Sequence, residues 1–246
     1  MSAALERDPV PTFLASMPTL YRERFDTGAA REHAAIAERR RSGAVHAEIW
    51  RALPGGVAAV CVLADDRPGL LSFVSASLVV HGLDVEAAQA FTRATEPPEA
   101  FDVFWLRRDG GIKAPVMPGD VVRVSETLQE LVTGRKTIDD VAREAERRRT
   151  AVPPAGSTRV AWVEGAAGET VLTVETFDRP GLLLAITSAL FRARVQIVSS
   201  EATVERGRIV DRFTLVEFDG APLRAGRHGV LQVEVLAAID ALRERR

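Results

Sequence analysis

The sequence predicts an α+β protein in which one folding unit occurs twice behind a short N-terminal helical segment. Its clearest feature is a hexapeptide, DRPGLL, which occupies Asp66–Leu71 and returns as Asp178–Leu183. A second signature, Phe101–Phe104, returns in the same order as Val210–Phe213. The predicted strands and helices follow the same order in both copies, so we expect each copy to be a complete folding unit.

The two copies of the second signature are three residues closer together in the sequence than the two copies of the hexapeptide. The first copy therefore has three additional residues between the two motifs. There the first copy carries the segment Thr95–Glu99 with the pair Pro97-Pro98, which the second copy lacks. Insertions are tolerated mainly in loops. We therefore expect this segment to be a loop between two strands.

Each unit is predicted to contain two strands, a helix, two strands and a second helix. The first helix follows the hexapeptide because Pro68 suits a first helical turn, where its missing N–H would be unpaired anyway. It ends near Gly82, which can adopt the left-handed C-terminal cap. In the first unit we expect strands at Val45–Arg51, Val57–Ala64, Leu83–Thr92 and Ala100–Arg108, and helices over Pro68–His81 and through Val121–Leu131.

The second unit repeats this order and sets the domain boundaries. Because nothing strand-like follows Leu242, the strand before each hexapeptide strand should supply the fourth strand of its sheet. Trp50 and Trp162 are separated by the same number of residues as the two hexapeptides, so they should occupy corresponding places in the two domains. The expected strands are Arg159–Glu164, Thr170–Thr176, Val195–Val204 and Arg208–Phe218, and the helices are Pro180–Phe191 and Gly229–Leu242. The predicted divisions are an N-terminal extension (1–43), a first domain (44–146), a linker (147–157) and a second domain (158–246).

Composition and charge exclude several functional classes. The 246 residues are 46% hydrophobic and 27% charged, as in an ordinary folded protein. A net charge of −2 lacks the strong positive field that nucleic acids or anionic membranes attract, so Arg39–Arg41 and Arg147–Arg149 are interpreted as solvated helix faces. The longest apolar stretch, Val57–Ala64, is far shorter than the roughly 20 residues that span a bilayer. We expect a cytoplasmic protein that binds neither nucleic acid nor membrane.

The sequence shows no pattern typical of a catalytic or metal site. Cys61, the only cysteine, lies in an apolar run and is interpreted as a core residue. The four histidines are scattered, and there is no phosphate-binding loop, dinucleotide-binding glycine pattern, nucleophile elbow or HExxH zinc motif. We therefore expect no catalytic residue, no metal and no cofactor.

The hexapeptide combines groups that suit a small zwitterion. A strand that leads directly into a helix leaves unpaired N–H groups at the positive end of the helix dipole, which can hold a carboxylate. Gly69 and Gly181 let a ligand approach the main chain. Asp66 and Asp178 can either cap the helix or receive an ammonium group. The alternative is purely structural, with Asp capping, Pro starting the helix and both leucines packing inward.

This arrangement resembles the ACT domain, a ferredoxin-like regulatory module that binds amino acids between paired domains. It is similar to the C-terminal ACT region of the bacterial protein-PII uridylyltransferase/uridylyl-removing enzymes, whose ACT pair is implicated in glutamine sensing. The Asp-x-Phe-Trp pattern at Asp102–Trp105 and the run Tyr21–Asp26 followed by His33 match that family. The resemblance spans roughly residues 13 to 220 and implies two tandem ferredoxin-like (ACT) domains.

The sequence also departs from that family's catalytic parts. Its nucleotidyltransferase needs a Gly-Ser loop followed by Asp-x-Asp, but no Asp-x-Asp occurs here and Gly156-Ser157 lies in the predicted linker. Its hydrolase needs a His-Asp pair, and no histidine of this chain precedes an aspartate. We therefore expect that this chain is not an enzyme.

The resemblance implies an amino-acid-binding regulatory protein of nitrogen or amino-acid metabolism, with glutamine as the first candidate effector. We expect a protein partner or a homo-oligomer to read the ligand. Gln89 and Glu201, which occupy equivalent places when the hexapeptides are aligned, are further side-chain candidates. The alternatives are a structural interaction module without ligand and a partner subunit of a uridylyltransferase-like enzyme. The predicted ligand-binding residues are Asp66, Arg67, Gly69, Leu70, Gln89, Asp178, Arg179, Gly181, Leu182 and Glu201.

Overall fold

The computed structural model of the chain describes residues 8–108, 114–148, 158–165, 168–177, 179–205 and 208–244. Its helices are α1 (Pro9–Ser16), α2 (Thr19–Arg24), α3 (Thr27–Arg39), α4 (Leu70–Val80), α5 (Pro118–Val132), α6 (Ile138–Arg148), α7 (Leu182–Arg192) and α8 (His228–Glu244). Its strands are β1 (His46–Ala52), β2 (Ala58–Asp65), β3 (Leu83–Arg93), β4 (Glu99–Arg108), β5 (Arg159–Glu164), β6 (Thr170–Thr176), β7 (Val195–Glu205) and β8 (Arg208–Glu217).

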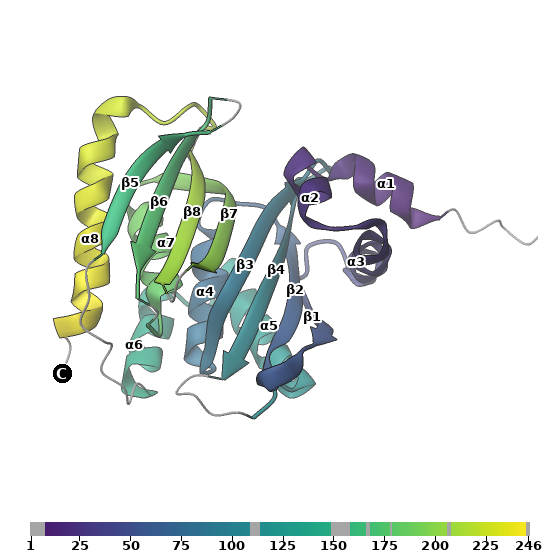
Figure 1. The fold of residues 1–246 in the computed structure, drawn as a ribbon. Coiled ribbons are helices and arrows are strands. Elements are labelled where there is room, and N and C mark those ends of the chain that lie inside the picture. The colour runs from purple at the N-terminus through teal and green to yellow at the C-terminus, as the bar shows by residue number, and fades with distance from the viewer. Residues whose placement is uncertain are drawn as a thin grey trace, which may run out of the picture.

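The strands form one antiparallel sheet in the order β1-β2-β4-β3-β7-β8-β6-β5 (Figure 1). Its first four strands come from the first unit and its last four from the second. The predicted fourth strands are confirmed, because β1 pairs with β2 and β5 pairs with β6. The chain is thus an α+β protein with two tandem ferredoxin-like units behind N-terminal helices.

The two halves of the sheet join along a short seam between β3 and β7. Three residue pairs form it: Ala88–Ala202, Gln89–Glu201 and Ala90–Ser200. Because Gln89 and Glu201 are equivalent in the repeat, the middle pair lies on a pseudo-two-fold axis, as in an isologous dimer. The hydroxyls of Ser72 on α4 and Ser188 on α7 also form a hydrogen bond of 2.9 Å across this axis.

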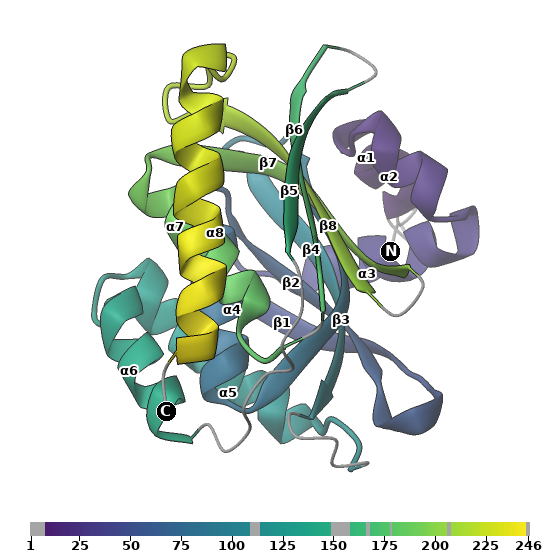
Figure 2. The same ribbon diagram turned by 60° about the vertical axis from the view of Figure 1, so that its left-hand side comes forward.

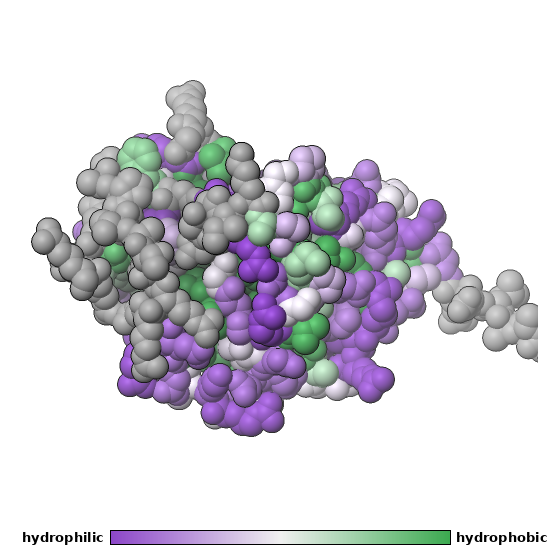
Figure 3. Space-filling model, turned by 90° about the horizontal axis from the view of Figure 1, so that it is seen from below, coloured by the Kyte–Doolittle hydropathy of each residue, from purple (hydrophilic) through white to green (hydrophobic). Residues whose placement is uncertain are grey.

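The helices cover the two faces of the sheet unequally (Figure 2). Helices α4 to α8 lie on one face, whereas α1 to α3 lie on the other face over the first unit only. Strand β2 is therefore buried on both sides. Val60 and Val62 join the core that contains α4 and α5, and Cys61 and Leu63 join a second core with the N-terminal helices. On the side drawn in Figure 3, hydrophobic residues lie in small areas separated by polar ones.

The two tryptophans do not occupy corresponding places, so that prediction is wrong. A register shift between Ile49 and Arg51 makes Trp50 a bulged residue of β1, and its ring contacts His33 in the N-terminal core. In β5 the pairing is regular, and Trp162 stacks instead on His228 of α8, with ring centroids 4.2 Å apart. One extra residue in a strand moves the side chain to the opposite face of the sheet.

The solvated-helix interpretation of the first arginine triplet is also wrong at its middle residue. The Arg40 side chain is only 7% exposed and forms ion pairs with Asp65 and Glu99, tying the end of α3 to β2 and β4. Side chains of the second triplet lie outside the described residues. The predicted linker begins inside α6, which ends at Arg148, and residues 149–157 are not among those described.

Candidate ligand-binding site

Both hexapeptides lie at the seam, each facing the other unit. The first follows β2 and leads into α4, and its cavity is closed by α7 and β7. The second follows β6 and leads into α7, and its cavity is closed by α4 and β3. Each cavity measures about 30 Å³, which is room for about two water molecules.

Asp66 anchors the turn after β2. Its carboxylate accepts a hydrogen bond of 2.7 Å from Thr92 Oγ1, and its N–H donates to the carbonyl of Pro98 at 2.9 Å. Burial raises the pKa of this carboxyl, and the Thr92 hydrogen bond partly offsets the effect. Helix α4 begins after Gly69 without a side-chain cap, so Asp66 does not cap it, one of the two roles expected for this residue.

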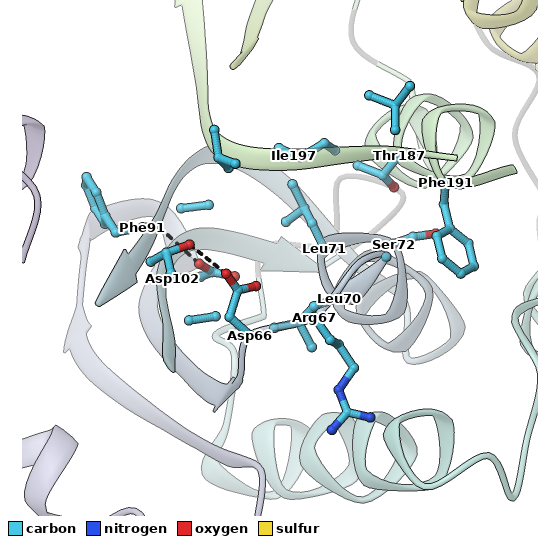
Figure 4. A pocket seen from close by; sticks show the side chains of 16 residues that line it. Asp66, Arg67, Leu70, Leu71, Ser72, Phe91, Asp102, Thr187, Phe191 and Ile197 are labelled. Carbon is cyan, nitrogen blue, oxygen red and sulfur yellow. Dashed lines mark hydrogen bonds between the residues drawn. The ribbon is translucent and has the colours of Figure 1, made fainter. Parts of the chain in front are cut away.

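Asp102 lies beside Asp66 in the first cavity (Figure 4). It is buried in the middle of β4 and accepts a hydrogen bond of 3.3 Å from the N–H of Phe91. Burial, followed by the neighbouring Asp66, raises the pKa of Asp102 well above its ordinary value. Sequence reasoning used Asp102 only as part of a signature. An aspartate repeated at the equivalent place of two strands, here and at Asp211, was the signal that could have identified it.

The two hexapeptide arginines point in different directions. Arg67 lines the first cavity with its stem, but its guanidinium turns away and donates to the carbonyl of Val132 at 2.9 Å (Figure 4). Arg179 is only 2% exposed, lines the second cavity and donates to Thr176 Oγ1 at 2.7 Å. The two guanidinium groups therefore have different partners, a helix carbonyl in the first unit and the hydroxyl of Thr176 in the second.

Both hexapeptide glycines adopt the left-handed conformation, with φ of +84° at Gly69 and +78° at Gly181. Their surroundings differ. A Cβ on Gly69 would lie 2.5 Å from the ring of Phe191, whereas one on Gly181 would have no atom within 4 Å. Leu70 and Leu182 pack inward, 4% and 5% exposed, as the structural interpretation of the hexapeptide predicted.

Gln89 and Glu201 come together, but outside both hexapeptide cavities. Gln89 Nε2 donates to Glu201 Oε1 at 3.4 Å in the middle of the seam, and Arg24 of α2 forms an ion pair of 2.8 Å with Glu201. Asp178, another predicted ligand-binding residue, lies outside the described residues.

A larger hollow of about 430 Å³ opens beside the second hexapeptide, between α4, α6, α7 and α8. We call it the α6 groove. Gly181 and Val79 line both this groove and the second cavity. Sequence reasoning missed it because the walls come from four helices whose packing the repeat pattern does not specify.

Within the described ranges, no three His, Cys, Asp or Glu side chains gather in a way that can hold a metal ion. None of the helices in the same ranges is both long enough and apolar enough to cross a membrane.

Relatives of this chain are bacterial enzymes much longer than the chain itself. It is 32% identical over 233 residues to the bifunctional uridylyltransferase/uridylyl-removing enzyme of Gluconobacter oxydans, covering 88% of this chain and 23% of that protein. The enzyme of the same description from Rhodospirillum rubrum is 28% identical over 239 residues, with coverages of 88% and 25%. This chain thus spans about a quarter of the length of the curated relatives it matches.

A solved aspartate kinase from Synechocystis aligns with 77% of this chain and 28% of its own, at 15% identity and a TM-score of 0.40. No protein-family model matches the chain. Its two ferredoxin-like halves and its similarity to long bacterial enzymes agree with the expectation from the hexapeptides. The chain thus consists of two tandem ferredoxin-like units and resembles the C-terminal region of the bifunctional uridylyltransferase/uridylyl-removing enzymes.

Proposed function

We propose that this chain is an amino-acid-responsive regulatory module of nitrogen or amino-acid metabolism, with glutamine as the first candidate effector. The position of both hexapeptides at the seam is the observation that carries the proposal. A ligand bound there contacts both units at once. It therefore favours the arrangement of the units in which those contacts are made.

The chemistry at the second hexapeptide suits an α-amino acid. The first N–H groups of α7 lack partners within the helix and carry its positive dipole end, which favours a carboxylate. Arg179 adds a positive charge nearby. Asp211 and Asp84, which line the same cavity, supply acceptors for an ammonium group.

The proposed role is regulatory and not catalytic. The relatives' described activities belong to proteins about four times as long, and this chain resembles their C-terminal region. Under this proposal, a protein partner or a second copy of the chain reads the arrangement of the two units. A partner with uridylyltransferase-like activity is one candidate.

A thermal-shift screen against the twenty amino acids, followed by calorimetry, tests the proposal. A ligand that binds only the folded chain adds about 2.7 kcal/mol at 100 times its Kd. Gly181→Val and Asp178→Asn should both lower the affinity. Stability should fall mainly in Gly181→Val, because a branched residue is strained at a φ of +78°. If no amino acid binds at millimolar concentration, the ligand-free interaction module is the better description.

A further inference from the structure

We infer that the two hexapeptide sites are not equivalent: the chain binds one amino acid, at Gly181, with the ligand's side chain in the α6 groove. This inference rests on the proposed function and adds to it the site, the stoichiometry and the residue that controls access. Three independent differences between the two sites support it.

The first difference is steric. Phe191 of α7 lies against Gly69 so closely that even a methyl group there would meet its ring at 2.5 Å. When the hexapeptides are aligned, Val79 of α4 is the counterpart of Phe191, and Val79 borders the space at Gly181. The smaller side chain leaves that space open, because a Cβ placed on Gly181 would have no atom within 4 Å. The main chain is thus accessible at the second glycine and covered at the first.

The second difference is volume. The first cavity holds about 30 Å³, far less than an amino acid occupies. Two larger hollows lie beside α7, the α6 groove and another between α5, α6 and α7, and Gly69 is not among the described residues that line either of them. The second cavity is equally small, but it shares Gly181 and Val79 with the α6 groove of about 430 Å³. Sites for small molecules usually measure about 300–1,000 Å³. A ligand can therefore place its α-carbon at Gly181 and its side chain in the groove.

The third difference is charge. The first cavity is lined by the carboxyls of Asp66 and Asp102, and no ion pair joins either to a basic side chain among the described residues. Such a site offers no cationic side chain to the carboxylate of an amino acid, because the guanidinium of Arg67 turns away from it to the carbonyl of Val132. The wall of the second cavity contains side chains of both charges, Asp84 and Asp211 together with the buried Arg179.

The groove indicates the class of amino acid. Its wall contains Asp139 and Arg143 of α6 and Ser188 and Arg192 of α7 among alanine and leucine side chains. The charged and hydroxyl groups of this wall can donate hydrogen bonds to, and accept them from, an uncharged polar group of the ligand. The alanine and leucine side chains can pack against an aliphatic stem that carries this group. A ligand of this class contacts α6 as well as both units.

A reciprocal exchange of the two covering residues tests the inference, with glutamine as the probe and calorimetry on the full chain. Val79→Phe places over Gly181 the ring that covers Gly69, and the affinity should fall at least tenfold. The matched control, Phe191→Val, should leave the affinity within twofold and the stoichiometry at one ligand per chain. Thermal melts check that both variants fold. Because Val79 is half-buried, Ala185→Phe, which fills the groove from α7, provides a second blocking variant.

The outcomes separate this inference from the proposed function. If the wild type binds glutamine but Val79→Phe and Ala185→Phe bind it equally well, the inference is wrong and the proposed function stands. A wild-type stoichiometry of two, or loss of binding in Phe191→Val alone, also overturns it. If the wild type binds none of the twenty amino acids, the proposed function itself fails.

Discussion

The two units share a backbone order but differ in what covers the outer face of the sheet. In the first unit, α1 to α3 cover this face, and the equivalent face of the second unit has no such helices among the described residues. The side chains follow this difference closely. At matched positions the first unit has Cys61, Leu63 and Val103, and the second has Thr173, Glu175 and Arg212. The pattern of hydrophobic residues along a strand therefore depends on whether helices cover one or both faces of the sheet. It does not depend on the fold of the unit, which is the same in both copies.

The covering layer is held by an aromatic cluster. Tyr21 and His33 are completely buried, and the Tyr21 hydroxyl and His33 Nδ1 form a hydrogen bond of 2.7 Å. Phe101 of β4 contacts both rings and that of Phe13, edge to face or tilted. The N-terminal helices thus depend on packing against one strand of the first unit.

The largest effect should come from Phe101→Ala. Deleting a fully buried phenylalanine costs about 3–5 kcal/mol, because contacts are lost and a cavity remains. The matched substitution in the second unit, Val210→Ala, removes two methyl groups and should cost only about 1.5 kcal/mol. Denaturant unfolding measures both. Equal losses would contradict the expectation that Phe101, packed under the N-terminal helices, contributes more than its counterpart in the second unit.

A second, smaller effect is expected from pH. Burial lowers the pKa of His33 to about 4, so between pH 6.5 and 4 the folded chain binds fewer protons than the unfolded chain. The stability due to neutral His33 is complete above pH 6.5 and is lost as pH falls toward 4, by about 3 kcal/mol in total. His33→Gln should flatten this part of the pH profile.

Tyr21→Phe is the matched control for the pH experiment. It removes the hydroxyl that bonds to His33 but leaves the imidazole in the same aromatic surroundings. Its unfolding free energy should be lower than that of the wild type and should keep the same dependence on pH. A pH profile unchanged in His33→Gln would mean that another group causes the acid sensitivity.

The smallest expected effects, about 1 kcal/mol each, concern Asp102 and Asp211 and should have opposite signs. The raised pKa of Asp102 means that the free energy of unfolding falls as pH rises above the ordinary aspartate range. Asp102→Asn should remove this loss and stabilise the chain at pH 7. Asp211→Asn should destabilise it, because Asp211 lines the same cavity as the positively charged Arg179. Thermal unfolding at several pH values measures both, and equal signs would contradict the distinction between the cavities.

The sequence predicted those features that depend on local pattern. The repeated hexapeptides located the two helix starts, and the absence of a late strand correctly assigned β1 and β5 as the fourth strands of their units. What it could not predict depends on tertiary contacts. The pairing of β3 with β7 joins two strands far apart in the chain, and the burial of Arg40 depends on acidic partners from two other strands.

The candidate site also has features that the local sequence predicts and features that depend on tertiary contacts. The need for a glycine at positions 69 and 181 was predicted, since a side chain there would block the approach to the main chain, but their left-handed conformation was not. The difference between their surroundings was not, because it comes from Phe191 and Val79 on the opposite unit. Two identical hexapeptides therefore have different environments, and only the packed structure distinguishes them.

The narrow seam has a mechanical consequence. β3 shares ten residue pairs with β4 inside its own unit but only three with β7 across the axis. The remaining contact between the units lies on the helical face of the sheet, where α4 and α7 pack together and residues of both units share one hydrophobic core. A ligand that wedges into either hexapeptide cavity must therefore shift this packing as well as the short strip of paired strands. Any rotation about Gln89 and Glu201 displaces the distant edges of the sheet, β1 and β5, the most.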